Sequence, residues 1–512
     1  MILGVLNANA QIIQIFTQEG IYYQVLQELP TYYLSPIIIN RKLSVPELIN
    51  LRKLLNNGGA ILIDAKNIGQ ISLDKFKRRR ISHLINDRSE AFNNILGVEL
   101  ELPGFVTKNQ ILAVEYANGY LAVLPFDLNQ AIADYRAKRK PFLTNIGKRY
   151  PNEIVATISK GALRQLIINL VRWLYKKLNY PYVHLWYYPH NHQSIFGFRV
   201  DTDFGSHVTI EKTFELEEKT NVKFTYFVHT QYLFDLPRET KDFQIHCDRH
   251  QVYKDYLRNY NNIATAKKIL ESLGLSPIGF AAPYGFWNIN LQRALEANCI
   301  KYSSEFSLAY DDLPFFPIVN GEPSTVLQIP IHPICIGRLL HAGVAPKNCV
   351  EYYFKYFTTQ LVKREPMIIY DHPHRIAEFF EIFGEILNRA QNLPNVWLTT
   401  LTNYYYWWVD RLRVLENSSW QIDGDMLKVY TTNVDPSFTL HIVLPNDTEA
   451  FIPLRSGVYN LNELKKTKIK YLNFTDRDIE EYKKLHSLKT KSLLILFSSA
   501  NKILKIITGR KK

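Results

Sequence analysis

The strongest constraint on the fold is an alternation of short apolar runs with helix-like stretches, from about residue 194 to residue 412. The apolar runs include FGFRVD, VKFTYFV, PIGFAAP and PMIIYDH, and stretches such as ATAKKILESLG and NLQRALEANC lie between them. This alternation predicts an α/β fold with a parallel sheet or barrel, because parallel strands need a crossover connection. In such folds the chemistry lies at the carboxyl ends of the strands.

The flanking regions differ from this central part, and the 512-residue chain is predicted to form three domains. Residues 1–190 predict an α/β domain, with strands in GGAILIDA and GYLAVLPFDL, an amphipathic helix in KGALRQLIINLVRWLYKKL, and a strand at the N-terminus. A proline-rich, aromatic connector, YPYVHLWYYPHNHQ, leads into the second domain, residues 191–412. Residues 413–512 contain short alternating strands and predict a small β-rich domain.

Charge and composition narrow the range of partners. The net charge of +13 favours anionic partners, but the lysines gather towards the C-terminus without an RNA- or DNA-binding motif. We therefore expect a solvated basic face and no nucleic-acid binding. The sequence contains no uncharged apolar stretch long enough to predict a transmembrane segment. The segment SLLILFSSANKILKII fits either peripheral contact with a membrane surface or a buried strand followed by a helix.

Cysteine usage bears on the compartment. The four cysteines have no paired spacing, and none occurs before Cys247. They predict reduced thiols and a cytoplasmic location. The N-terminal residues lack the pattern of a signal peptide. The sequence gives no indication of an oligomeric state.

Two aspartates end the first apolar run of the central region. Asp201 and Asp203, in FRVDTDFG, are two residues apart, so on an extended chain they share a face. Two carboxylates that converge in this way repel each other. A bound metal ion removes the repulsion, and so does a turn in which aspartate bonds its own backbone.

A pair of histidines follows in FQIHCDRHQVY. His246 and His250 are four residues apart, and on a helical turn that spacing places both imidazoles on one face, about 5–6 Å apart at Cβ. Together with a carboxylate of the D-x-D pair they form a Zn-type ligand set that leaves a position for water. The combination favours metal binding over solvated or capping histidines.

Two further stretches complete a pattern. GFAAPYGFWN runs from a strand into a Pro-Tyr-Gly turn, and IIYDHPHRI is a strand that delivers Asp371 and His372. In this order the four stretches resemble the polysaccharide deacetylases of the NodB homology type (carbohydrate esterase family four), in the branch whose first motif reads D-x-D. The resemblance spans residues 194–412 and implies a distorted (β/α)7 barrel. The N-terminal domain resembles a class I glutamine amidotransferase or flavodoxin-like fold, but it has no cysteine nucleophile, so we predict no amidotransferase chemistry.

The resemblance implies a role for each motif residue. Asp201 would be the general base, His372 the general acid, and the backbone N–H of Tyr284 would help hold the oxyanion. Three side chains would bind a divalent metal ion, most readily zinc: Asp203, His246 and His250. Such an ion polarises the acetyl carbonyl and lowers the pKa of bound water, while the base and acid move the protons.

The sequence departs from the family pattern at two places. The family arginine two residues before the proline is replaced by Ala281, so the pKa of Asp201 is expected to rise unless another cation substitutes. Arg199 is either that substitute or an ordinary strand-edge arginine. The fourth motif of the family carries an aspartate that tunes the acid histidine, and near that position the stretch YSSEF offers Glu305. Four weaker candidates are more typical of core or surface side chains: Trp287, His332, His341 and His374.

The sequence therefore predicts a metal-dependent deacetylase-type hydrolase that removes acetyl groups from an N- or O-acetylated sugar or glycan. Two alternatives stay open. One is a C–N hydrolase of the same fold that acts on a small non-sugar amide. The other is a barrel that keeps its metal but has lost catalysis and serves as a glycan-binding or scaffold module. The absent arginine favours this last alternative, whereas Asp201 and His372 argue against it.

Overall fold

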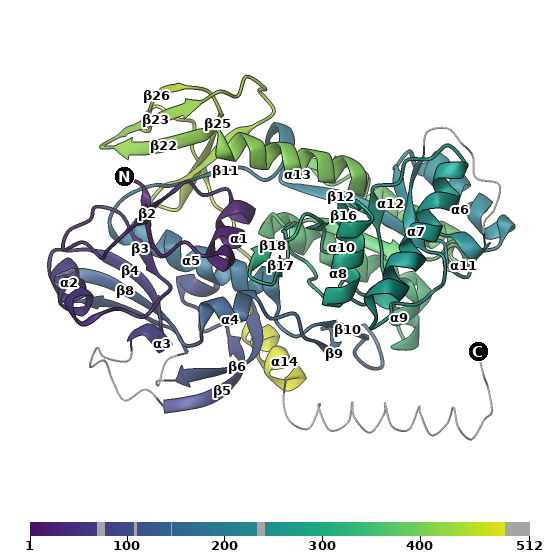
Figure 1. Ribbon diagram of the computed structural model, residues 1–512, viewed down its shortest axis with the longest axis horizontal. Coiled ribbons are helices and arrows are strands. Elements are labelled where there is room, and N and C mark those ends of the chain that lie inside the picture. Colours follow the sequence, from purple (N-terminus) through teal and green to yellow (C-terminus); the bar gives the residue numbers. More distant parts are fainter. Residues whose placement is uncertain (69–76, 107–109, 145, 233–240, 487–512) are drawn as a thin grey trace.

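The computed structural model describes residues 1–68, 77–106, 110–144, 146–232 and 241–486 (Figure 1). The segment SLLILFSSANKILKII and the last lysines of the basic stretch lie outside the described residues. Within those ranges, no helix combines the length and the apolar character needed to cross a membrane. All four cysteines are unpaired, and three of them are buried.

The N-terminal part contains a sheet with the strand order β2-β1-β3-β4-β8-β7. Its strands are β1 (Leu3–Leu6), β2 (Tyr23–Leu26), β3 (Ile37–Ile39), β4 (Ala60–Asp64), β7 (Leu112–Tyr116) and β8 (Gly119–Leu124). Neighbours in this sheet are parallel except for β7, which pairs antiparallel with β8 at the edge. Apolar clusters cover both faces of the sheet, as expected for parallel strands.

Helices α1 (Ala10–Glu19), α2 (Val45–Asn56) and α5 (Lys160–Lys177) pack on this sheet. The strand predicted at the N-terminus is confirmed only over β1, because the chain forms helix α1 from Ala10 onwards. Helix α1 begins at Ala10 because the side chain of Asn9 accepts a hydrogen bond from the backbone N–H of Ile12, which is an N-cap. Helix α2 begins with a capping box in which Ser44 and Glu47 bond each other's backbone.

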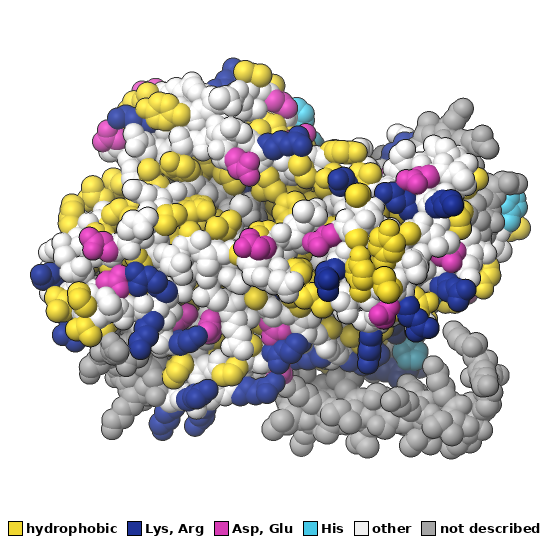
Figure 2. Space-filling view, viewed as in Figure 1, with side chains coloured by type: hydrophobic (Ala, Val, Ile, Leu, Met, Phe, Trp, Pro, Cys, Tyr) yellow, Lys and Arg dark blue, Asp and Glu magenta, His cyan; other side chains and the backbone are white. Residues whose placement is uncertain are grey.

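The hairpin of β5 (Lys77–Ile85) and β6 (Gly97–Val106) carries part of the positive charge. Figure 2 shows Lys and Arg side chains gathered along the lower edge of the molecule, where these strands lie in Figure 1. The first four residues of β5 are basic and exposed, and Arg80 pairs with Glu101 at 3.2 Å. The charge therefore also lies on a solvated face outside the C-terminal stretch.

The central part is built on a parallel sheet with the order β19-β16-β15-β14-β13-β12-β20, and β21 also pairs with β12. Its strands are β12 (Ser194–Asp201), β13 (Phe224–His229), β14 (Asp242–Cys247), β15 (Gly279–Phe280), β16 (Tyr302–Ser303), β19 (Leu327–Gln328), β20 (Met367–Asp371) and β21 (Val396–Leu398). Its helices are α6 (His207–Thr220), α7 (Tyr256–Ser272), α8 (Ile289–Ala297), α9 (Ile336–His341), α10 (Pro346–Lys363), α11 (Pro373–Glu378), α12 (Phe380–Gln391) and α13 (Leu401–Glu416). The predicted parallel α/β sheet is confirmed.

Strand β12 is buried along its whole length. Phe196, Phe198 and Val200 pack in the cluster formed with the surrounding helices. Because side chains alternate along a strand, Arg199 and Asp201 lie on the opposite face, with Ile195, which packs in a separate aromatic cluster. The sheet therefore directs two charged side chains of β12 into the buried face that this aromatic cluster covers.

The C-terminal part consists of antiparallel strands. One sheet contains β22 (Ser418–Asp423), β23 (Met426–Thr431) and β26 (Gly457–Asn460); the other contains β24 (Thr439–Val443), β25 (Thr448–Pro453), β27 (Thr467–Lys468) and β11 (Tyr182–Leu185). The segment expected to be a connector thus supplies β11, which pairs with β24. Helix α14 (Asp476–Leu485) follows and contacts β5.

A buried ion cluster joins the N-terminal and central parts. Arg164 of α5 contacts Glu19 at 2.9 Å and Asp312 at 2.8 Å, and it also contacts Glu365. The four side chains are at most 3% exposed. Removing one member of such a cluster leaves uncompensated buried charge, so the contact fixes α5 against the central sheet. Asp312 and Glu365 are its members from the central part.

Candidate metal centre

The carboxyl ends of the central strands bring the predicted residues together. Asp201 ends β12, His246 lies one residue before the end of β14, and Asp371 ends β20. Asp203 follows β12 by two residues and His372 follows β20 directly. Parallel strands share one carboxyl edge, so these side chains meet at the same edge of the sheet.

Asp203, His246 and His250 form a compact group. The Nε2 atom of His246 is 3.6 Å from Oδ1 of Asp203, and Nε2 of His250 is 3.3 Å from Oδ2. One ligand atom from each residue lies within 4.8 Å of the others. This separation suits two imidazoles and a carboxylate that share one cation.

The protonation of these groups also suits a cation. Nδ1 of His246 lies 2.7 Å from the carbonyl oxygen of Ala281, an acceptor, so Nδ1 carries the hydrogen and the Nε2 lone pair faces Asp203. Burial lowers the pKa of His246 well below its usual value and that of His250 to about 4, and it raises the pKa of Asp203 to about 6. At pH 7 the imidazoles are therefore neutral and the carboxylate is mostly ionised.

Two buried atoms of this group lack a conventional partner. Within the described residues, Oδ1 of Asp203 and Nε2 of His246 have no hydrogen-bond partner. A buried polar atom without a partner costs about 1–3 kcal/mol, and one cation between them would satisfy both. A donor set of two imidazole nitrogens and a carboxylate fits zinc. Asp201, Asp203 and His372 also converge, but both oxygens of Asp201 already accept hydrogen bonds.

The histidines meet for a different reason than the sequence suggests, and the helical-turn interpretation is wrong. His246 belongs to strand β14, and residues 248–250 form bends. The pairing of β13 with β14 shifts after Val228, which leaves His246 unpaired between Ile245 and Cys247. Such a bulge re-aims side chains and is common next to active sites.

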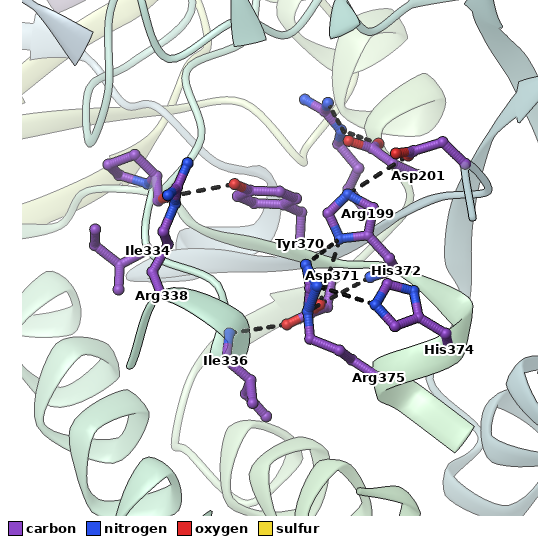
Figure 3. A network of polar contacts seen from close by, with 12 residues as sticks. Arg199, Asp201, Ile334, Ile336, Arg338, Tyr370, Asp371, His372, His374 and Arg375 are labelled. Atoms are coloured by element: carbon purple, nitrogen blue, oxygen red, sulfur yellow. Dashed lines mark hydrogen bonds and ion pairs between the residues drawn. The ribbon is translucent and has the colours of Figure 1, made fainter. Parts of the chain in front are cut away.

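Arg199 supplies the counter-charge of Asp201, in place of an arginine at the position of Ala281. Its Nε and Nη2 atoms lie 2.6 and 2.7 Å from the two oxygens of Asp201 (Figure 3). Its Nη1 donates to the carbonyl oxygen of Ser304. The guanidinium also lies over the rings of Phe227 and Tyr370. Burial acts to raise the pKa of Asp201, but Arg199 outweighs it and the pKa lies below its usual value. Arg199 is therefore the substituting cation that the sequence offered as one of two alternatives, the pKa of Asp201 does not rise, and the strand-edge interpretation is wrong.

His372 contacts two carboxylates, that of Asp203 through Nε2 at 3.5 Å and that of Asp371 through Nδ1. Its Nδ1 lies 3.5 Å from Oδ1 of Asp371, a fully buried side chain that also accepts from Arg375 Nε at 3.0 Å and from the backbone N–H of Ile336 at 2.8 Å (Figure 3). Burial acts to lower the pKa of His372, but the charges of Asp203 and Asp371 raise it above its usual value. Glu305 instead lies close to Arg199, and burial raises the pKa of Glu305 to about 7.

The Asp371→Asn variant tests this contact. Without the carboxylate the pKa of His372 should fall, and a proton donor is lost as the pH rises through its pKa. The alkaline limb of the pH–rate profile of acetate release is therefore expected to move to lower pH. Asp311→Asn is the matched control, because Asp311 holds His332 at 3.1 Å in a separate, partly buried pair. An unmoved limb in Asp371→Asn, or an equal shift in both variants, would contradict the role of Asp371.

The other predicted residues divide between this centre and the rest of the molecule. The ring of Tyr284 lies 4.8 Å from that of His250, centroid to centroid. His374 also lies nearby and contacts Arg375. In contrast, His332 bonds Asp311 and Tyr352, and Trp287 bonds Gln292.

Sequence reasoning assigned no role to three neighbours of the centre: Arg375, Phe204 and His229. The four-residue spacing of Asp371 and Arg375 across the first turn of α11 was an available signal for the first of them.

No family model matches the sequence, and no curated protein matches it. Among solved structures, the chain is similar to a putative polysaccharide deacetylase from Mycobacterium smegmatis, with 16% identity, a TM-score of 0.38, and coverage of 44% of this chain and 93% of that one. It is also similar to Puue allantoinase, with 14% identity, a TM-score of 0.38, and coverage of 44% and 93%. A third structure, Agd3, a carbohydrate deacetylase, has 9% identity and a TM-score of 0.35 and covers 88% of this chain and 92% of that one. Polysaccharide deacetylases are thus among the structural neighbours, but at these TM-scores the reaction and substrate have to be inferred from the centre itself.

Proposed function

We propose that this protein is a metal-dependent hydrolase that removes acetyl groups from an N- or O-acetylated sugar or glycan. The observation that carries the proposal is the meeting of three units at one edge of the sheet. These are the convergent group of Asp203, His246 and His250, the carboxylate of Asp201 paired with Arg199, and the imidazole of His372 beside Asp371. A hydrolase needs a cation, a base and an acid within reach of one carbonyl.

In this proposal each residue has one task. Asp203, His246 and His250 hold a divalent ion, most readily zinc, which when bound polarises the carbonyl and acidifies water. Asp201, kept ionised by Arg199, accepts the proton of the attacking water. His372, whose Nδ1 lies against Asp371, donates a proton to the leaving group. The backbone N–H of Tyr284 helps hold the oxyanion.

The fold and the alternatives bear on this proposal. We infer that the central sheet is a distorted (β/α)7 barrel. We also infer that the N-terminal part is flavodoxin-like, because its parallel strands have the order β2-β1-β3-β4-β8, which is 2-1-3-4-5 when only these strands are numbered. The antiparallel C-terminal strands would form a third, β-rich domain. The contact of Arg199 with Asp201 removes the main argument for a barrel that has lost catalysis. A small non-sugar amide remains the second candidate substrate.

The Asp201→Asn variant tests the proposed function. It is expected to keep its zinc, because Asp203 and both histidines are unchanged, and to release acetate about 10²–10⁴-fold more slowly, the usual contribution of a general base. Acetate release from acetylated sugars and the zinc content of the purified protein are the two measurements. Asp64→Asn, a buried aspartate of the N-terminal sheet, serves as the control. Unchanged turnover in Asp201→Asn would remove Asp201 as the base.

A further inference from the structure

Exposed aromatic side chains gather around the candidate metal centre. Phe204 is 65% exposed, and its ring lies 5.7 Å from that of His250. Tyr284 is 60% exposed and lies on His250 as well, and its ring is 6.1 Å from that of Phe286. Exposed aromatic side chains that gather beside polar groups are typical of ligand-binding surfaces.

The backbone at two of these residues is strained. Phe204 has φ +60° and Tyr284 has φ +58°, in the left-handed region that bulky side chains rarely adopt. The chain is also tight after Phe204, because a Cβ on Gly205 would lie 3.0 Å from the carbonyl oxygen of Thr202 and 3.2 Å from Pro373. Residues in such conformations cluster at functional sites. An aromatic ring exposed to solvent adds no packing to the core that could offset the cost of its left-handed backbone. A role in binding would account for that cost.

Phe204 lies between the two halves of the proposed chemistry. Its ring is 5.7 Å from the proposed ligand His250 and 6.3 Å from the proposed acid His372, and it is 6.2 Å from His374. One side of the ring thus lies against the imidazoles, and the exposed remainder is available to a ligand whose reacting group reaches the centre.

We infer that Phe204 determines specificity by stacking against the sugar ring that carries the acetyl group. This inference rests on the proposed function and narrows its substrate to a pyranoside. A pyranose presents a flat face of C–H groups that can cover an aromatic ring, while its hydroxyl groups stay at the edge. A small aliphatic amide or ester has no such face and would leave Phe204 exposed.

The test compares two substrates in variants of Phe204. For an N-acetylated hexosamine oligomer, Phe204→Ala is expected to raise KM about 10- to 100-fold, the effect of losing a buried phenyl contact. Phe204→Trp is expected to keep KM near the wild-type value. For ethyl acetate, which has no ring, the loss of kcat/KM in Phe204→Ala is expected to be several-fold smaller than for the oligomer. An unchanged KM in Phe204→Ala, or equal losses on both substrates, would overturn the inference.

Two further proteins guard against indirect effects. Phe204→Gly relieves the left-handed backbone, so it is expected to raise Tm while it loses affinity for the oligomer as Phe204→Ala does. Tyr430→Ala removes an equally exposed ring, 59% exposed, from strand β23 and is expected to change neither KM nor Tm. If Phe204→Gly keeps wild-type affinity, the ring has no role in binding.

Binding of the deacetylated oligomer, measured by saturation-transfer NMR with a chelator present, separates this inference from the proposed function. If no sugar yields acetate but the oligomer binds wild type and not Phe204→Ala, the proposed function fails and the stacking role stands. If acetate is released while the oligomer binds both proteins equally, the stacking role fails and the proposed function stands. If the oligomer binds neither protein, the stacking role fails as well.

Discussion

The His246→Ala variant is expected to purify without stoichiometric zinc and to release acetate at least about 10³-fold more slowly than wild type. Nε2 of His246 is buried, faces Oδ1 of Asp203 at 3.6 Å, and has no hydrogen-bond partner in the described part of the chain. Removing it takes away one of three proposed ligand atoms. Loss of the ion forfeits several kcal/mol of transition-state stabilisation, which corresponds to this factor.

The control for this prediction is another buried histidine. His184 is 2% exposed and bonds His441 at 2.8 Å, between β11 and β24 and away from the centre. Its alanine variant is expected to lose stability and to keep both zinc and turnover per folded molecule. Elemental analysis of the purified proteins and acetate release are the measurements. Full zinc content in His246→Ala would remove this residue as a ligand.

The sequence predicted which residues meet in the centre better than how they meet. The residue types and their order along the chain were sufficient for Asp203, His246 and His250. The register of β13 against β14 was not predictable, because the bulge at His246 depends on pairing between strands and not on local spacing. The four-residue spacing of His246 and His250 therefore predicts a helical turn, whereas the chain there forms the end of β14 followed by bends.

The partners of the proposed base and acid show the same limit. Alternation along β12 placed Arg199 on the face of Asp201, but burial of the pair depends on Phe227 and Tyr370, which come from neighbouring strands. Similarly, β11 was read as a connector because its partner, β24, lies more than 200 residues later in the chain. Contacts between distant segments leave no signal in local composition or periodicity.

The Arg199→Ala variant is expected to lose about 3–5 kcal/mol of unfolding free energy, because removing one partner leaves the other charge buried and unpaired. Arg199 and Asp201 are 1% and 6% exposed in their side chains, so water cannot replace the lost contacts. Chemical denaturation at pH 7 is the measurement. Arg338→Ala is the control, since Arg338 pairs with Glu153 but is 39% exposed, and partly exposed pairs contribute much less.

The pH dependence follows from the lowered pKa of Asp201. A carboxylate whose pKa is depressed by folding stabilises the protein above its unfolded pKa, and this stability is lost as the pH falls through the folded value. The stability difference between wild type and Arg199→Ala should therefore narrow in acid. In any activity that Arg199→Ala retains, the acid limb should move to higher pH, because burial then raises the pKa of the proposed base unopposed.

A double variant separates charge from packing at this pair. Arg199→Met combined with Asp201→Asn removes both charges and keeps similar volumes, so it is expected to recover most of the stability lost in Arg199→Ala. Its rate of acetate release should nevertheless stay far below that of wild type, because the proposed base is absent. The opposite outcome is a double variant that loses as much free energy of unfolding as Arg199→Met and Asp201→Asn lose together. That result would show that the arginine stabilises the sheet through its stacking on Phe227 and Tyr370 and not through Asp201. In that case the lowered pKa of Asp201 would not contribute to the free energy of unfolding. The ion pair would then affect only the acid limb of the pH–rate profile.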